Sequence, residues 1–214
     1  MTGWLGLLTF GLMFGVRHAL DPDHVIAIAT ISARTPSMRR SVGVGAVWGL
    51  GHTMTILALG GTMVLFRAVI SARAGMAMEF AVALMLIGLG IANLLSARHL
   101  EPAAPSPLRP FIIGMVHGMA GSAALAVLVL ATIDDSATGL LYLLLFGVGT
   151  IAGMIAVTSV MTFPMGVVSG RTAASRRWLT AASGLASVLF GVLMVHGLGG
   201  PLALLAADSH LIPR

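Results

Sequence analysis

The sequence contains no cysteine and no lysine, and it has few charged residues of any kind. Without cysteine, disulfides, thiolate metal ligands and thiol redox chemistry are excluded. Charged residues make up only 9% of the chain, against about 25% in a typical soluble domain. Hydrophobic residues make up 57%. We therefore predict an integral membrane protein almost from end to end, with the lipid bilayer as its surroundings.

The missing lysine also limits the partners and the energy source. All 12 basic residues are arginine, and the net charge of +5 arises in loops predicted to face lipid headgroups. No basic patch supports a nucleic-acid partner. No Gly-x4-Gly-Lys-Ser/Thr loop is present for nucleotide phosphates, so a drive by ATP would need another subunit. The N-terminal segment lacks the positive region of a cleavable signal, so we expect a retained span.

Six hydrophobic stretches are long enough to cross a bilayer, which takes about 20 residues of helix. They run approximately over residues 3–33, 42–66, 77–97, 110–132, 138–163 and 178–198. The fold class predicted is all-α, a polytopic membrane protein with about six transmembrane helices. Residues 1–214 are expected to form a single integral membrane domain.

The arginines are unevenly divided between the two sides that such a topology defines. The more basic side carries Arg34, Arg39, Arg40, Arg98, Arg109, Arg171, Arg176 and Arg177. The other side carries Arg67, Arg73 and Arg214. Because cytoplasmic loops are enriched in basic residues, the first side is predicted to be cytoplasmic. We therefore expect a multi-pass protein of the cytoplasmic (inner) membrane with both termini outside.

The two halves of the chain, approximately residues 1–100 and 108–200, resemble each other. Aligning His18 with His117 sets Phe-Gly-Val-Arg-His against Ile-Gly-Met-Val-His, and the next spans share a Gly-x-Gly pair at Gly49 and Gly147. In the third spans, Asn93 aligns with His196. Three spans per half predict a 3+3 inverted repeat, a common plan for secondary transporters. Chance alignment of glycine-rich apolar helices is the alternative.

The segment His18-Ala-Leu-Asp-Pro-Asp-His24 places two imidazoles and two carboxylates in the first span. Ionisable groups at membrane depth cost about 2.5–3.5 kcal/mol each, and they usually mark an ion or substrate path. On a straight helix, His18 and His24 would point about 120° apart. Pro22 predicts a kink or unwinding around residues 18–22 that frees a backbone oxygen and lets both rings turn inward.

A mixed imidazole and carboxylate set without sulfur suits borderline divalent cations such as nickel, cobalt and zinc. The candidate metal ligands are His18, Asp21, Asp23, His24, His52 and His117. Flanking glycines favour close helix approach at His52 and His117. A helix–helix hydrogen bond is the alternative role for any lone histidine, above all His196. Asp21 and Asp23 could instead cap a helix after the break, and Arg17 could be their counter-ion.

Residues 17–25, Arg-His-Ala-Leu-Asp-Pro-Asp-His-Val, resemble the signature of the nickel/cobalt transporter family (the NiCoT/NicO superfamily). His18, Asp23 and His24 occupy the signature positions, and Asp21 fits the wider context. Leu50-Gly-His-Thr resembles the family's second histidine motif, which places His52. The segment beginning at His117 resembles the branch that includes urease-accessory membrane proteins of the UreH type. The resemblance implies a membrane permease for nickel or cobalt.

We therefore expect a transition-metal permease that takes up Ni²⁺ or Co²⁺ as transported substrate, with no cofactor and no catalytic residue. One alternative is a non-transporting membrane accessory protein that supplies nickel to urease or hydrogenase maturation. Another is a nickel/cobalt exporter, although the long histidine-rich loop of many exporters is missing. A third alternative is a membrane metalloenzyme, which would need a general base and a substrate cleft in addition to the metal ligands. The sequence leaves open whether the protein forms a homo-oligomer. It also leaves open whether a metallochaperone or a urease-maturation protein is its partner.

Overall fold

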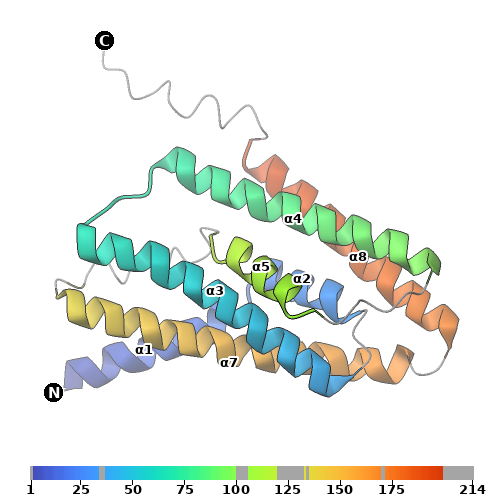
Figure 1. The fold of residues 1–214 in the computed structure, drawn as a ribbon, viewed down its shortest axis with the longest axis horizontal. Helices are drawn as coiled ribbons and strands as arrows, with labels where there is room; N and C mark the ends of the chain where they lie inside the picture. The colour runs from blue at the N-terminus through green and yellow to red at the C-terminus, as the bar shows by residue number, and fades with distance from the viewer. Residues whose placement is uncertain are drawn as a thin grey trace, which may run out of the picture.

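The protein is described here by a computed structural model, which covers residues 2–33, 37–99, 106–119, 133, 135–169 and 172–199. Within these ranges the secondary structure is helical and contains no strand, so the predicted all-α class is confirmed. The helices, labelled as in Figure 1, are α1 (Thr2–His18), α2 (Pro22–Ser32), α3 (Met38–Phe66), α4 (Ala72–His99), α5 (Leu108–His117), α7 (Ser136–Ser169) and α8 (Ala173–Gly197).

Four of the helices are long and apolar enough to cross a membrane: Met38–Phe66, Ala72–Ala97, Ser136–Phe163 and Ala173–Gly197. Each coincides with one predicted span to within a few residues. Large apolar side chains such as Leu50, Leu84 and Phe163 are exposed on these helices, as expected for helices surrounded by lipid. The predicted span 110–132 begins in α5 and continues outside the described residues, so the count of six stays a prediction.

The first predicted span is broken where Pro22 was expected to break it. α1 ends at His18, and α2 begins at Pro22 after three residues that are not helical. The carbonyl oxygen of His18 is not the backbone oxygen that the break was expected to free, because it accepts a hydrogen bond from the backbone N–H of Asp21 at 3.0 Å. A tight turn thus provides the donor that the proline ring cannot.

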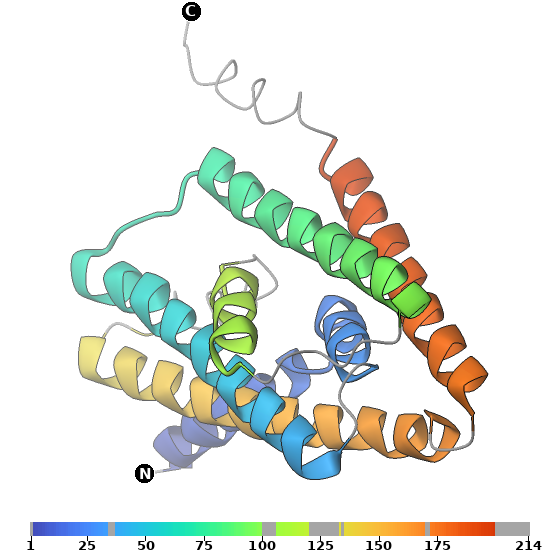
Figure 2. The same cartoon turned by 45° about the vertical axis from the view of Figure 1, so that its right-hand side comes forward.

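The helices pack in two layers around two short helices. α3 and α7 run antiparallel and side by side, with α1 along α7 and α5 along α3 (Figure 1). α4 and α8 form a second pair, and α2 and α5 lie between this pair and the α3–α7 pair (Figure 2). The two short helices thereby bring their ends into the middle of the molecule.

Small residues allow the helices of the first layer to approach closely, as the sequence predicted. A Cβ atom added to Gly51 would collide with the backbone of Phe111 on α5, and one added to Gly149 would collide with the backbone of Leu12 on α1. Gly147 accepts a hydrogen bond from the Thr53 hydroxyl at 3.2 Å across the α3–α7 contact. Gly43, by contrast, has open space beside it.

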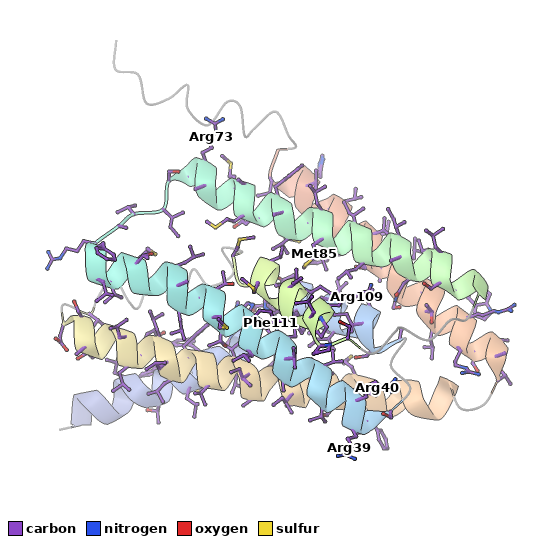
Figure 3. The ribbon with its side chains drawn as sticks, in the orientation of Figure 1. Arg39, Arg40, Arg73, Met85, Arg109 and Phe111 are labelled. Carbon is purple, nitrogen blue, oxygen red and sulfur yellow. The ribbon has the colours of Figure 1, made fainter. Side chains whose placement is uncertain are left out.

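Charged and capping residues lie at the helix ends. Arg39 and Arg40 lie at the beginning of α3, and Arg73 lies at the beginning of α4 on the opposite side of the view (Figure 3). Asp135 precedes α7 and accepts hydrogen bonds from the Thr138 hydroxyl at 2.5 Å and the Thr138 backbone N–H at 2.8 Å. These bonds lower the pKa of Asp135, because they stabilise its charged form.

Candidate metal centre

The break in the first span brings two histidine rings together. His18 is the last residue of α1, and His24 is the third residue of α2. The centroids of the two rings lie 4.6 Å apart, although a straight helix would point them about 120° apart. The loss of three helical residues before Pro22 therefore creates a site that a continuous helix could not hold.

His52 joins these two histidines from α3. The ligand atoms that His18, His24 and His52 offer lie within 4.8 Å of one another. His18 Nε2 and His52 Nε2 are 3.0 Å apart. Two imidazole nitrogens bound to one metal by bonds of about 2.1 Å lie about 3.0–3.4 Å apart when the angle at the metal is about 90–110°. The two nitrogens therefore have the spacing of neighbouring ligands.

Asp23 links His24 to His117, which comes from the end of α5. Asp23 Oδ1 lies 3.0 Å from His24 Nδ1, and Asp23 Oδ2 lies 3.0 Å from His117 Nε2. Asp23, His24 and His117 form a second group whose ligand atoms lie within 4.8 Å of one another. His24 belongs to both groups, so all five of these clustered side chains form one continuous polar centre.

Asp21 orients His18. Its Oδ2 atom lies 2.9 Å from His18 Nδ1, and a carboxylate at one ring nitrogen fixes the tautomer that leaves the other nitrogen free for a metal. Asp21 occupies the N-cap position of α2, but its side chain makes no capping hydrogen bond. The alternative that Arg17 pairs with these carboxylates is not borne out: Arg17 is exposed, and within the described residues Asp21 and Asp23 pair with histidines.

The centre is almost closed to solvent. His24 and His117 have no exposed surface, and His52 is 1% exposed. Three ring nitrogens, His24 Nε2, His52 Nδ1 and His117 Nδ1, are buried and have no hydrogen-bond partner among the described residues. Buried polar atoms are nearly always paired, because a missing partner costs free energy. Of these three residues, His24 belongs to both ligand groups, so a cation in the centre could become the partner of its Nε2.

Helix ends favour positive charge at this place. α1 ends at His18 and α5 ends at His117, and a helix C-terminus carries about half an elementary charge of negative sign. α2 begins here with its positive N-terminal end, but Asp23 lies in its first turn and offsets that charge. Two helix C-termini and two carboxylates thus surround the imidazoles.

Two aromatic residues that the sequence analysis did not single out contact the histidine rings. The ring of Trp48 on α3 lies 5.8 Å from that of His24 and 5.5 Å from that of His117, between centroids. The ring of Phe146 on α7 lies 5.4 Å from that of His18. A signal was present in the sequence, because each residue directly precedes one of the two Gly-x-Gly pairs.

Asn93 and His196, which the repeat alignment matched, lie in different environments. Asn93 is buried, and its amide nitrogen donates to the carbonyl oxygen of Thr30 at 2.6 Å and to the hydroxyl of Ser183 at 3.2 Å. It therefore ties α2 to α8. His196 is exposed on α8 and belongs to neither ligand group of the described residues. His210 lies outside the described residues.

The fold and the site define a polytopic helical membrane protein with a buried cluster of imidazoles and carboxylates at a helix break. A family model described as a high-affinity nickel-transport protein, NicO, matches residues 3–101, which include His18, Asp23, His24 and His52. The chain belongs to this NicO family. The predicted resemblance to nickel/cobalt transporters is confirmed.

Two known proteins are similar in sequence. The urease accessory protein UreH from Bacillus sp. (strain TB-90) is 35% identical over 212 residues, which cover 91% of this chain and 92% of the relative. The chloroplast protein FOR GROWTH AND FERTILITY 1 from Arabidopsis thaliana is 28% identical over 178 residues, 72% of this chain and 48% of that relative. The chain thus aligns with about half of the plant protein. No solved structure matches the chain.

Proposed function

We propose that this protein carries Ni²⁺ or Co²⁺ across the cytoplasmic membrane into the cell, by way of the buried centre between α1, α2, α3 and α5. The observation that carries the proposal is the pair of Nε2 atoms of His18 and His52, which face each other at 3.0 Å while Asp21 holds the far side of His18. Membership of a nickel-transport family supports the substrate class. The metal is the cargo in this proposal.

The ion would use two overlapping positions. In the first position, His18, His24 and His52 supply imidazole nitrogens, which favour nickel, cobalt and zinc over magnesium. In the second position, Asp23, His24 and His117 supply a carboxylate and two imidazoles. Because His24 is common to both, the ion could move from one position to the next without losing all of its ligands.

A direct test is nickel binding by the purified protein in detergent free of chelators. We expect tight binding by the unaltered protein, and a loss of affinity of more than about 100-fold for His52→Ala, since a first ligand matters at least as much as the groups that orient it. The matched control is His196→Ala, which removes an exposed histidine of α8. Equal binding by His52→Ala and the control would reject the assignment of the centre.

The accessory role is the second candidate, because the similar Bacillus protein is named a urease accessory protein. Purified protein in liposomes separates the two. Accumulation of radioactive nickel without another protein supports a carrier, and loading the metal on either side in turn gives the direction. Tight binding without accumulation would instead favour a protein that hands nickel to a maturation partner.

A further inference from the structure

We infer that Phe146 and Trp48 are two gates of the metal path, each closing one side of the histidine cluster. This inference rests on the proposed transport function and adds the residues that control access to the site. The histidines account for binding, but a carrier must also keep its site from opening to both sides at once.

The aromatic rings lie at opposite ends of a row of histidines. Phe146 contacts the ring of His18, which contacts His24 and His52 at centroid distances of 4.6 and 5.0 Å. The rings of His24 and His117 lie 4.4 Å apart between centroids, and the ring of Trp48 contacts both of them. The order is therefore Phe146, then the imidazoles, then Trp48. Phe146 is 2% exposed and Trp48 is fully buried, so neither leaves an open passage.

Each gate residue belongs to a separate apolar cluster. Phe146 packs with Ile56, Tyr142 and Leu143. Trp48 belongs to the other cluster, which contains residues such as Ile28, Leu86 and Met154. A hydrated cation cannot pass through dry apolar packing, and hydrophobic constrictions are known to act as gates in membrane proteins.

The backbone contacts of the two residues are equivalent. A Cβ atom on Gly15 of α1 would collide with the carbonyl group of Phe146, and one on Gly114 of α5 would collide with the carbonyl oxygen of Trp48. Phe146 thus lies against α1, which ends at His18, and Trp48 lies against α5, which ends at His117. A shift of α1 or α5 would therefore move a clustered histidine and the neighbouring gate residue together.

Because α3 and α7 are antiparallel, the two gates lie toward opposite sides of the membrane, Trp48 toward the beginning of α3 and Phe146 toward the beginning of α7. Each gate follows the first residue of its helix, Met38 or Ser136, by ten positions, which is about 15 Å along a helix. Arg39 and Arg40 mark the beginning of α3 as cytoplasmic under the positive-inside rule. Trp48 is therefore the inner gate and Phe146 the outer gate.

The natural absence of cysteine makes the gates testable by one-sided labelling. A single reporter, His52→Cys, places a thiol in the cluster between the gates. Sealed right-side-out and inside-out vesicles are treated with a membrane-impermeant maleimide without added metal. Starting from slow labelling on both sides, Phe146→Ala should speed labelling from outside, and Trp48→Ala from inside, by roughly tenfold or more in each case.

Matched controls remove exposed aromatic rings. Phe163→Ala changes a side chain of α7 that is 67% exposed, and Trp178→Ala changes one of α8 that is 76% exposed. Both should label as slowly as the reporter alone. If an alanine variant is not monodisperse, Phe146→Leu and Trp48→Leu replace it, with a smaller but still one-sided increase expected.

An increase from both sides with either variant, or no increase with both, would overturn the gates. The readout needs no metal, so it is independent of nickel binding by the unaltered protein. One-sided labelling with no nickel binding would leave the gates in place and reject nickel as the cargo. Nickel binding with two-sided labelling would reject the gates and leave nickel as the proposed cargo.

Discussion

Asp21 and Asp23 have different surroundings although a single proline separates them. The Asp23 side chain is 10% exposed and contacts two imidazoles, whereas that of Asp21 is 35% exposed and contacts one. Because water screens a buried charge least, Asp23 is the carboxylate that would offset most of the charge of a dication in the proposed site. Asp21 would act on the ion through the orientation of His18.

Replacing Asp21 should weaken metal binding without abolishing it. Asp21→Asn and Asp21→Ala free the Nδ1 side of His18, and loss of a group that orients a ligand reduces metal affinity by about 10–100-fold. Equilibrium dialysis with nickel measures the change. Asp135→Asn is the matched control, since this carboxylate lies at the start of α7 and Asn preserves a helix cap. Unchanged affinity for both Asp21 variants would show that His18 needs no such partner.

At this scale the sequence predicted most of the centre but not its boundary. The ionisable residues could be found because imidazole and carboxylate are rare and costly in an apolar span. Trp48 and Phe146 were missed, because an aromatic residue in such a span has the same cost whether it faces lipid or a ligand. Their place directly before the two Gly-x-Gly pairs was a local signal, but their contacts with the histidine rings depend on how the helices pack.

At the scale of helices, one break was predictable and one helix end was not. Pro22 predicts the break after His18, because proline has no backbone N–H to donate a helical hydrogen bond. α5 ends at His117, with Gly118 following in a right-handed helical conformation, and no proline lies there. The hydrophobic run over 110–132 therefore predicted one span, although the helix ends within it.

Close helix packing makes a sharp prediction for two glycines of α3. Gly51→Ala forces a methyl group into the backbone of Phe111, which is labelled on α5 (Figure 3), and overpacking of this kind costs about 1–3 kcal/mol of unfolding free energy. Gly43→Ala points into open space, and it should change stability by less than about 1 kcal/mol in the stabilising direction. Thermal unfolding in one detergent compares the two.

The comparison is informative because both substitutions add the same methyl group to the same helix. Gly51→Ala should also weaken nickel binding, since a displaced α5 moves His117 relative to Asp23. Equal stability of the two variants would mean that α5 does not lie against α3 as closely as described. A stability loss without a change in nickel affinity would separate helix packing from the metal centre.

For the whole molecule, the helix pairs are those that exchanging the two halves would produce. α3 pairs with α7 and α4 with α8, while α1 against α7 corresponds to α5 against α3. The contacts of Gly51 with Phe111 and of Gly149 with Leu12 follow the same exchange. The inverted repeat stays a prediction, because the residues that continue from α5 lie outside the described ranges and Asn93 and His196 differ in burial.

A helix that crosses the membrane once, as α3 is predicted to do, has its two ends on opposite sides, and the arginines predict which side is which. Arg39→Cys places a thiol at the beginning of α3, and Val69→Cys places one in the loop after its end, where Val69 is 89% exposed. Because basic loops stay in the cytoplasm, an impermeant maleimide added to intact cells should label Val69→Cys and spare Arg39→Cys. The opposite labelling would reverse the predicted orientation in the membrane, and Trp48 would then be the outer gate and Phe146 the inner one. The geometry of the proposed metal centre would be unaffected, since it depends on the contacts among α1, α2, α3 and α5 and not on which side they face.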